Sequence, residues 1–149
     1  MKTALALLSL ALAGSAASDV GYHAQFVGAT FTGIPAKSKA QLNLTAPDGL
    51  IFVCRGQTWN IGYAKIETLE YGQSVSRRYA AALLISPIFL LSKSRRHFVT
   101  IGYTDANGKQ QALVFRVEKS DVRTVLTTLE ARSGRRVEYQ DEEARRTGR

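Results

Sequence analysis

The sequence has one cysteine, Cys54, and two histidines among its 149 residues. A single cysteine excludes an internal disulfide bond and a metal site made of several cysteines. The longest apolar runs hold about a dozen residues, whereas a membrane-spanning helix needs roughly 20. Internal repeats and low-complexity segments are also lacking. With 45% hydrophobic residues, the chain suits one domain with its own core.

The first residues are typical of a signal peptide. Lys2 gives a positive start, Ala4 to Ala13 form an apolar stretch, and small residues precede a cleavage site expected after Ala17 or Ser18. An uncleaved anchor is the alternative. No cysteine lies at the cleavage site, which argues against lipid modification. We therefore expect an exported protein, periplasmic or extracellular and in possible contact with a membrane.

This interpretation divides the chain into residues 1–18 (signal peptide), 19–140 (folded domain) and 141–149 (disordered charged tail). Without Lys2 the chain keeps 19 basic and 12 acidic residues, a net charge of +7. In an exported protein this charge favours anionic lipid or an anionic envelope polymer over nucleic acid as a partner. The arginine pairs after Gly134 have a simpler alternative explanation, which is that they keep the chain end solvated.

Alternating apolar residues and turn signals predict seven β-strands. The clearest pair runs from His97 to Thr104 and from Lys109 to Val117, with Asn107-Gly108 supplying the positive φ of a tight turn. The return strand is expected to turn three side chains into the core, namely Leu113, Phe115 and Val117. The other five predicted strands are Val20 to Phe31, Ala40 to Thr45, Leu50 to Cys54, Ile66 to Tyr71 and Ala80 to Ile85.

One amphipathic helix is predicted at about residues 120–133. Its apolar stripe has i, i+3, i+4 and i+7 spacing and consists of Val122, Val125, Leu126 and Leu129. Ser120 or Asp121 offers an N-terminal cap, and Gly134 suits a left-handed C-terminal cap. A single such helix after a run of strands is expected to cover an opening in a sheet or barrel. Beyond it, Val137 and Tyr139 either add a short strand or pack on the barrel.

The segment from Arg77 to Arg96 combines an apolar run, Ala80 to Leu91, with cations on both sides. One interpretation buries Ala80 to Ile85 as a strand. The other projects an apolar loop whose tip enters a membrane interface or a partner while the cations meet anionic groups. The candidate membrane- or partner-binding residues are Arg77, Arg78, Ile88, Phe89, Leu90, Lys93, Arg95 and Arg96.

An enzyme would need a thiol, a base and an orienting carboxylate. The best set is Cys54 with His97 and either Asp105 or Glu67. However, the apolar surroundings of Cys54 disfavour a thiolate. We therefore expect no catalysis, and the sequence indicates no cofactor and no metal site.

The strands, the last hairpin and the closing helix resemble in order a bacterial pleckstrin-homology-like (PH-like or GRAM-like) domain. The segment from Trp59 to Ile66 also resembles the entry into a middle strand of such domains. The resemblance covers residues 20–134 and implies a mainly β fold, a barrel of about seven antiparallel strands in two sheets capped by the C-terminal helix. Lys37 and Lys39 lie between the first two strands, but no basic residue on the next strand completes a phosphoinositide pocket.

The fold implied by this resemblance serves mostly as a binding scaffold. The favoured hypothesis is a non-enzymatic binding module of the cell envelope that engages a protein partner or an anionic membrane surface through residues 77–96. The first alternative is a structural or assembly subunit that uses residues 80–91 as a protein–protein interface. The second is a thiol-dependent enzyme that uses Cys54 and His97.

Overall fold

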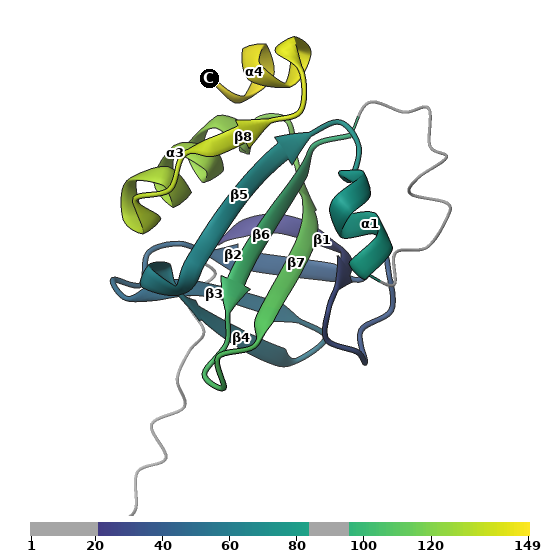
Figure 1. Ribbon diagram of the computed structural model, residues 1–149, viewed down its shortest axis with the longest axis vertical. Coiled ribbons are helices and arrows are strands. Elements are labelled where there is room, and N and C mark those ends of the chain that lie inside the picture. The colour runs from purple at the N-terminus through teal and green to yellow at the C-terminus, as the bar shows by residue number, and fades with distance from the viewer. Residues whose placement is uncertain (1–20, 84–95) are drawn as a thin grey trace, which may run out of the picture.

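In the described part of the computed structural model, eight strands form one mixed sheet, accompanied by three α-helices (Figure 1). The structure describes residues 21–83 and 96–149. The expected signal peptide, and the candidate residues Ile88, Phe89, Leu90, Lys93 and Arg95, lie outside the described residues. Among the described residues, no helix combines the length and apolar character needed to cross a bilayer.

The strands are β1 (Tyr22–Ala29), β2 (Lys39–Asn43), β3 (Gly49–Cys54), β4 (Gln57–Gly62), β5 (Ile66–Gly72), β6 (Phe98–Thr104), β7 (Gln110–Val117) and β8 (Val137–Tyr139). Their order in the sheet is β4-β3-β2-β1-β7-β6-β5-β8. Neighbours are antiparallel except β5 and β8, which run parallel. The sheet is not closed, because β4 and β8 are its two ends.

Strand β1 connects the two halves of the sheet. It pairs with β2 on one side and with β7 on the other, and its register shifts between Phe26 and Gly28. In Figure 1, β2 and β3 run at a clear angle to β5, β6 and β7. The bend brings apolar side chains of both halves together, so that Phe52 of β3 packs on Phe115 of β7 with 5.9 Å between ring centroids.

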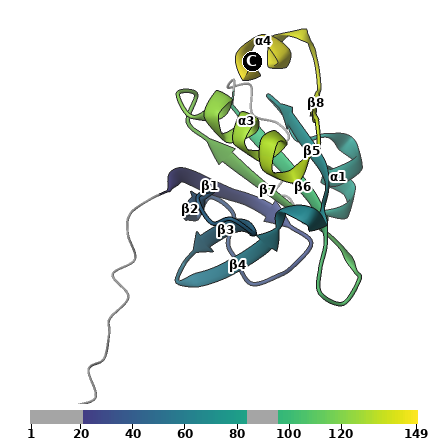
Figure 2. The same cartoon turned by 90° about the vertical axis from the view of Figure 1, so that its left-hand side faces the viewer.

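Helix α3 (Val122–Ser133) covers the opening of this bent sheet (Figure 2). It contacts β5 and the short 3-10 helix η1 (Tyr63–Lys65). The predicted apolar stripe is confirmed, because all four of its residues are at most 1% exposed. Gly134 ends the helix at φ 70°, as expected for a left-handed cap. Asp121 takes the N-cap position without a side-chain cap hydrogen bond.

The predicted strand from Ala80 to Ile85 is wrong over its described part. Residues Arg77–Ala82 form helix α1 instead. A run of alanines favours a helix because alanine has the highest helix propensity. The helix packs on the outer face of the sheet, where Tyr79 and Leu83 join a second apolar cluster that includes Phe98 and Val114. This cover explains why Ala112 and Val114 are buried as well as the predicted Leu113, Phe115 and Val117.

Two further expectations need correction. The count of seven strands omitted β4, which pairs with β3 along its whole length. It also omitted β8, so that of the two alternatives for Val137 and Tyr139, a short strand or packing on the barrel, the structure shows the strand. The tail predicted to be disordered forms helix α4 (Glu142–Gly148). The Asp141 carboxylate accepts the Ala144 N–H at 2.7 Å, and Ala144 is fully buried. A cap and a buried contact therefore hold the C-terminal helix on the domain.

Candidate functional site

Of the candidate binding residues, Arg78 has a well-defined set of partners. Arg77 begins α1, and Arg96 precedes β6. The Arg78 guanidinium pairs with the carboxylate of Glu70 on β5 and, at 3.1 Å, with that of Glu138 on β8. The Glu70 side chain is 7% exposed, whereas that of Arg78 is 55% exposed. The charge of Arg78 therefore balances a buried carboxylate and fastens α1 to the sheet.

The residues proposed as a thiol-dependent site are engaged with other partners. Cys54 Sγ donates to the Lys39 carbonyl at 3.4 Å, and His97 Nδ1 lies 2.6 Å from the Tyr71 hydroxyl. Burial raises the pKa of the Cys54 thiol, against a smaller opposing effect of Arg55. A raised pKa disfavours the nucleophilic thiolate.

The two candidate orienting carboxylates are held at the hairpin between β6 and β7. Asp105 Oδ1 accepts the N–H groups of Asn107 and Lys109, and Glu67 accepts hydrogen bonds from Thr104 and Gln110. Among the hydrogen bonds of residues 21–83 and 96–149, none joins Cys54, His97, Asp105 or Glu67 to another of these four. In the same part of the chain, no three metal-ligating side chains are grouped to hold an ion.

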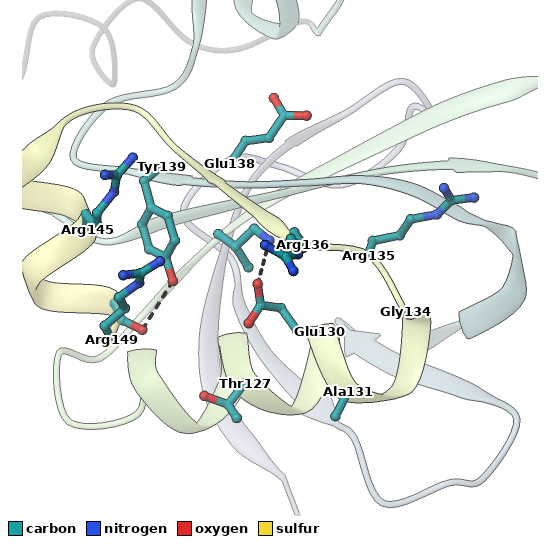
Figure 3. Close-up of a pocket in the computed structure, with 12 residues that line it drawn as sticks. Thr127, Glu130, Ala131, Gly134, Arg135, Arg136, Glu138, Tyr139, Arg145 and Arg149 are labelled. Atoms are coloured by element: carbon teal, nitrogen blue, oxygen red, sulfur yellow. Dashed lines mark hydrogen bonds between the residues drawn. The ribbon is translucent and has the colours of Figure 1, made fainter.

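A cationic groove lies between α3, β8 and α4 (Figure 3). It has a volume of about 860 Å³ and is open to solvent. Four arginines line it, two from the segment after α3 and two from α4 and the residue that follows: Arg135, Arg136, Arg145 and Arg149. We call this groove, which is lined by the four arginines and by Tyr139, the arginine groove.

Two glutamates also line the arginine groove, but both are engaged within the fold. Glu130 Oε1 accepts the Val137 N–H at 2.7 Å, which ties α3 to β8. Glu138 points away from Tyr139 and Arg149 (Figure 3), and it pairs with Arg78. The carboxylates therefore serve the fold, and the guanidinium groups dominate the electrostatics of the groove.

The four arginines differ in how far they are already bound. Arg135 Nε donates to the Ile66 carbonyl at 3.1 Å, and Arg145 pairs with Glu142 at 3.2 Å across one turn of α4. Arg136 is exposed and forms no ion pair with another described residue. Burial raises the pKa of Tyr139, with a further contribution from Glu130, while Arg149 and Arg145 act in the opposite direction. The Arg149 side chain is hydrogen-bonded to Tyr139. Of the four arginines, Arg136 is therefore the most available to donate hydrogen bonds to an anion.

The four arginines equip the groove to hold an anion. Guanidinium groups bind phosphate and carboxylate oxygens through two parallel hydrogen bonds. The sequence matches no protein-family model and no curated protein.

The arginine groove escaped the sequence analysis because its residues looked like a solvated chain end. A helical signal was nevertheless available. Asp141 followed by Glu142 and Glu143 is typical of a helix start, and Arg145 with Arg146 is typical of a helix end. No pattern in the sequence indicated that this helix returns to lie beside α3.

Proposed function

We propose that this chain is a non-enzymatic binding module of the cell envelope, built on a PH-like barrel, whose arginine groove engages an anionic membrane surface. The observation that carries the proposal is the set of four arginines around one open groove, in which both glutamates already have partners inside the fold. Phosphate groups of lipid headgroups offer the oxygens that such a set of guanidinium donors binds best.

The strand arrangement supports the barrel part of this proposal. Strands β1 to β7 follow the order 4-3-2-1-7-6-5 with antiparallel neighbours throughout. The register shift in β1 falls where the sheet bends, and a bulge of this kind increases local bending. The buried stripe of α3 fills the opening between the two halves, which is the place of the capping helix in the expected architecture.

Charge gives the expected strength of the membrane contact. Each arginine close to an anionic surface contributes about 1 kcal/mol. One residue would give only weak binding, whereas three acting together correspond to about a hundredfold in affinity. The contact should weaken with salt, because exposed charges are screened over about 10 Å at 0.1 M ionic strength.

We also propose that residues 77–96 contact the membrane, in addition to the arginine groove. Helix α1 is fixed to the sheet by Arg78 and by the apolar cluster under Tyr79 and Leu83. The apolar candidates Ile88, Phe89 and Leu90 come after α1 in the chain. They remain the proposed apolar contact with the membrane interface, next to the cations Lys93, Arg95 and Arg96.

Co-sedimentation of residues 19–149 with vesicles tests the proposal. Wild-type chain should bind vesicles that contain phosphatidylglycerol and should not bind pure phosphatidylcholine. The groove variant Arg136→Gln, Arg145→Gln, Arg149→Gln should lose about a hundredfold in affinity.

The matched control removes the same charge away from the groove, through Arg55→Gln, Lys65→Gln and Lys109→Gln. All three residues are exposed, and none lines the arginine groove. The control should bind nearly as wild type does. Equal losses in both variants, or equal binding to neutral vesicles, would overturn the proposal, and binding only to a protein partner would replace it.

A further inference from the structure

A second cationic pocket lies on the other flank of α4. It has a volume of about 520 Å³ and is formed by the turn before α3, the first turn of α3 and the last turn of α4. Its lining consists of three cations and three hydroxyl side chains, namely Lys119, Arg123, Arg146, Ser120, Thr124 and Thr147. We call it the α3–α4 pocket.

The cations of the α3–α4 pocket are not neutralised by the fold. Lys119, Arg123 and Arg146 are exposed, and none forms an ion pair with another described residue. No carboxylate lines the pocket. Two carboxylates flank Lys119 and Ser120 in the chain, Glu118 and Asp121, and Asp121 accepts the Ser120 hydroxyl hydrogen at 3.2 Å. Three like charges around one hollow repel one another, and an anion placed between them would relieve that repulsion.

The elements that carry these donors are anchored in the core. Val122 and Val125 of α3 are fully buried on either side of Arg123 and Thr124, and Ala144 of α4 is fully buried two residues before Arg146. Thr147 donates its hydroxyl hydrogen to the Glu143 carbonyl at 3.1 Å, which leaves its oxygen able to accept but not to donate elsewhere. The Ser120 hydroxyl likewise donates to Asp121. The available donors are therefore the three cations and the hydroxyl of Thr124.

We propose that the α3–α4 pocket is a second anion site, separate from the arginine groove, and that it binds a phosphate group. Donors approach the pocket from three elements, and phosphate presents acceptor oxygens in four directions. A carboxylate presents two oxygens in one plane and would leave part of the donors unused. This site does not require that the arginine groove binds a membrane.

The pKa of His97 gives a second measure of anion binding, one that needs no substitution. Burial lowers the pKa of His97, and the positive charges of Lys119 and Arg116 lower it further, while Glu118 acts in the opposite direction. Tyr71 occupies its Nδ1. An anion bound beside Lys119 offsets part of that positive charge, so the His97 pKa should rise. Sulfate is the suitable probe for this titration because its charge stays constant near neutral pH.

The main test is an NMR titration of residues 19–149 with inorganic phosphate, with sodium chloride adjusted to hold the ionic strength. Amide shifts at Ser120, Arg123, Thr124 and Thr147 should saturate. Arg123→Gln or Arg146→Gln should weaken the affinity by about tenfold, since each removes charge-assisted hydrogen bonds. The control Arg136→Gln, in the arginine groove, should leave the affinity unchanged.

Shifts that rise linearly without saturation, or that are unaffected by either variant, would overturn the proposal. So would a His97 pKa that is the same in sulfate and in chloride. The vesicle assay then separates the sources of phosphate. If Arg146→Gln also weakens binding to phosphatidylglycerol vesicles, the bound group is a lipid headgroup. If vesicle binding is retained while phosphate binding is lost, the site takes a soluble phosphate compound.

Discussion

The hydroxyl of Tyr71 lies 2.6 Å from Nδ1 of His97, and the two rings stack with 4° between their planes. Tyr71 is fully buried, and burial, with the nearby Tyr139 and Asp141, raises its pKa to about 12. The hydroxyl is therefore protonated at neutral pH and donates to Nδ1 of a neutral imidazole. This bond joins the end of β5 to the residue before β6, close to the end of the core that α4 covers.

We predict that the free energy of unfolding decreases as the pH falls below 6.5. The folded-state pKa of His97 lies below its ordinary value of 6.5, chiefly through burial and then through Lys119 and Arg116. Between these two pKa values the unfolded chain binds more protons than the folded chain. The stabilisation is therefore fully present above pH 6.5 and is lost as the pH falls through the lower folded-state value.

Urea denaturation at a series of pH values checks this prediction with His97→Gln, which keeps a hydrogen-bond acceptor for Tyr71. The variant should show a flatter dependence of unfolding free energy on pH. His23→Gln, on the exposed side of β1, is the matched control and should keep the wild-type dependence. Identical pH profiles for wild type and His97→Gln would contradict the account.

The second prediction concerns Arg78 and the buried Glu70. Arg78→Met should destabilise the fold by about 1–3 kcal/mol, because it leaves a buried carboxylate without its charged partner. Adding Glu70→Gln should recover part of that loss, since the remaining group is then neutral. Chemical denaturation of the single and double variants measures both effects. Arg123→Met, an exposed arginine without a described ion pair, should change stability little, and a loss equal to that of Arg78→Met would refute the prediction.

The third prediction concerns Cys54, which is 1% exposed and has a raised pKa. Its thiol should react with a disulfide reagent such as DTNB far more slowly in the native protein than in the unfolded protein. Because Cys54 is the sole cysteine, the absorbance signal has one source. Fast native reaction at neutral pH would revive the thiol-dependent alternative, as would loss of a measured activity in Cys54→Ala.

The parts of the fold that follow from local patterns were predictable. The stripe of Val122, Val125, Leu126 and Leu129 has helical spacing, and Gly134 marks its end, so α3 could be placed closely. The last hairpin also follows from its alternation and from Gly108, which adopts φ 75°. In both cases one sequence segment contains all the information that the structure uses.

The other features of the fold, and both cationic sites, depend on contacts between segments that lie far apart in the chain. The run from Ala80 has no alternation to separate a buried strand from a helix, and only the sheet face beneath α1 decides between them. Arg78 meets Glu138 across 60 positions, and β8 runs parallel to β5 because α3 carries the chain back across the domain. The arginine groove and the α3–α4 pocket both arise from that return, so no spacing of arginines could have indicated them.

The most direct test of the central claim, that the arginine groove binds an anionic surface, is the salt dependence of vesicle affinity. Wild-type chain and the Arg55, Lys65 and Lys109 control should lose about tenfold or more in affinity for phosphatidylglycerol vesicles between about 50 and 200 mM sodium chloride. The triple variant of Arg136, Arg145 and Arg149 should bind weakly at both concentrations, with a much flatter dependence. An unchanged slope in that variant would contradict the account.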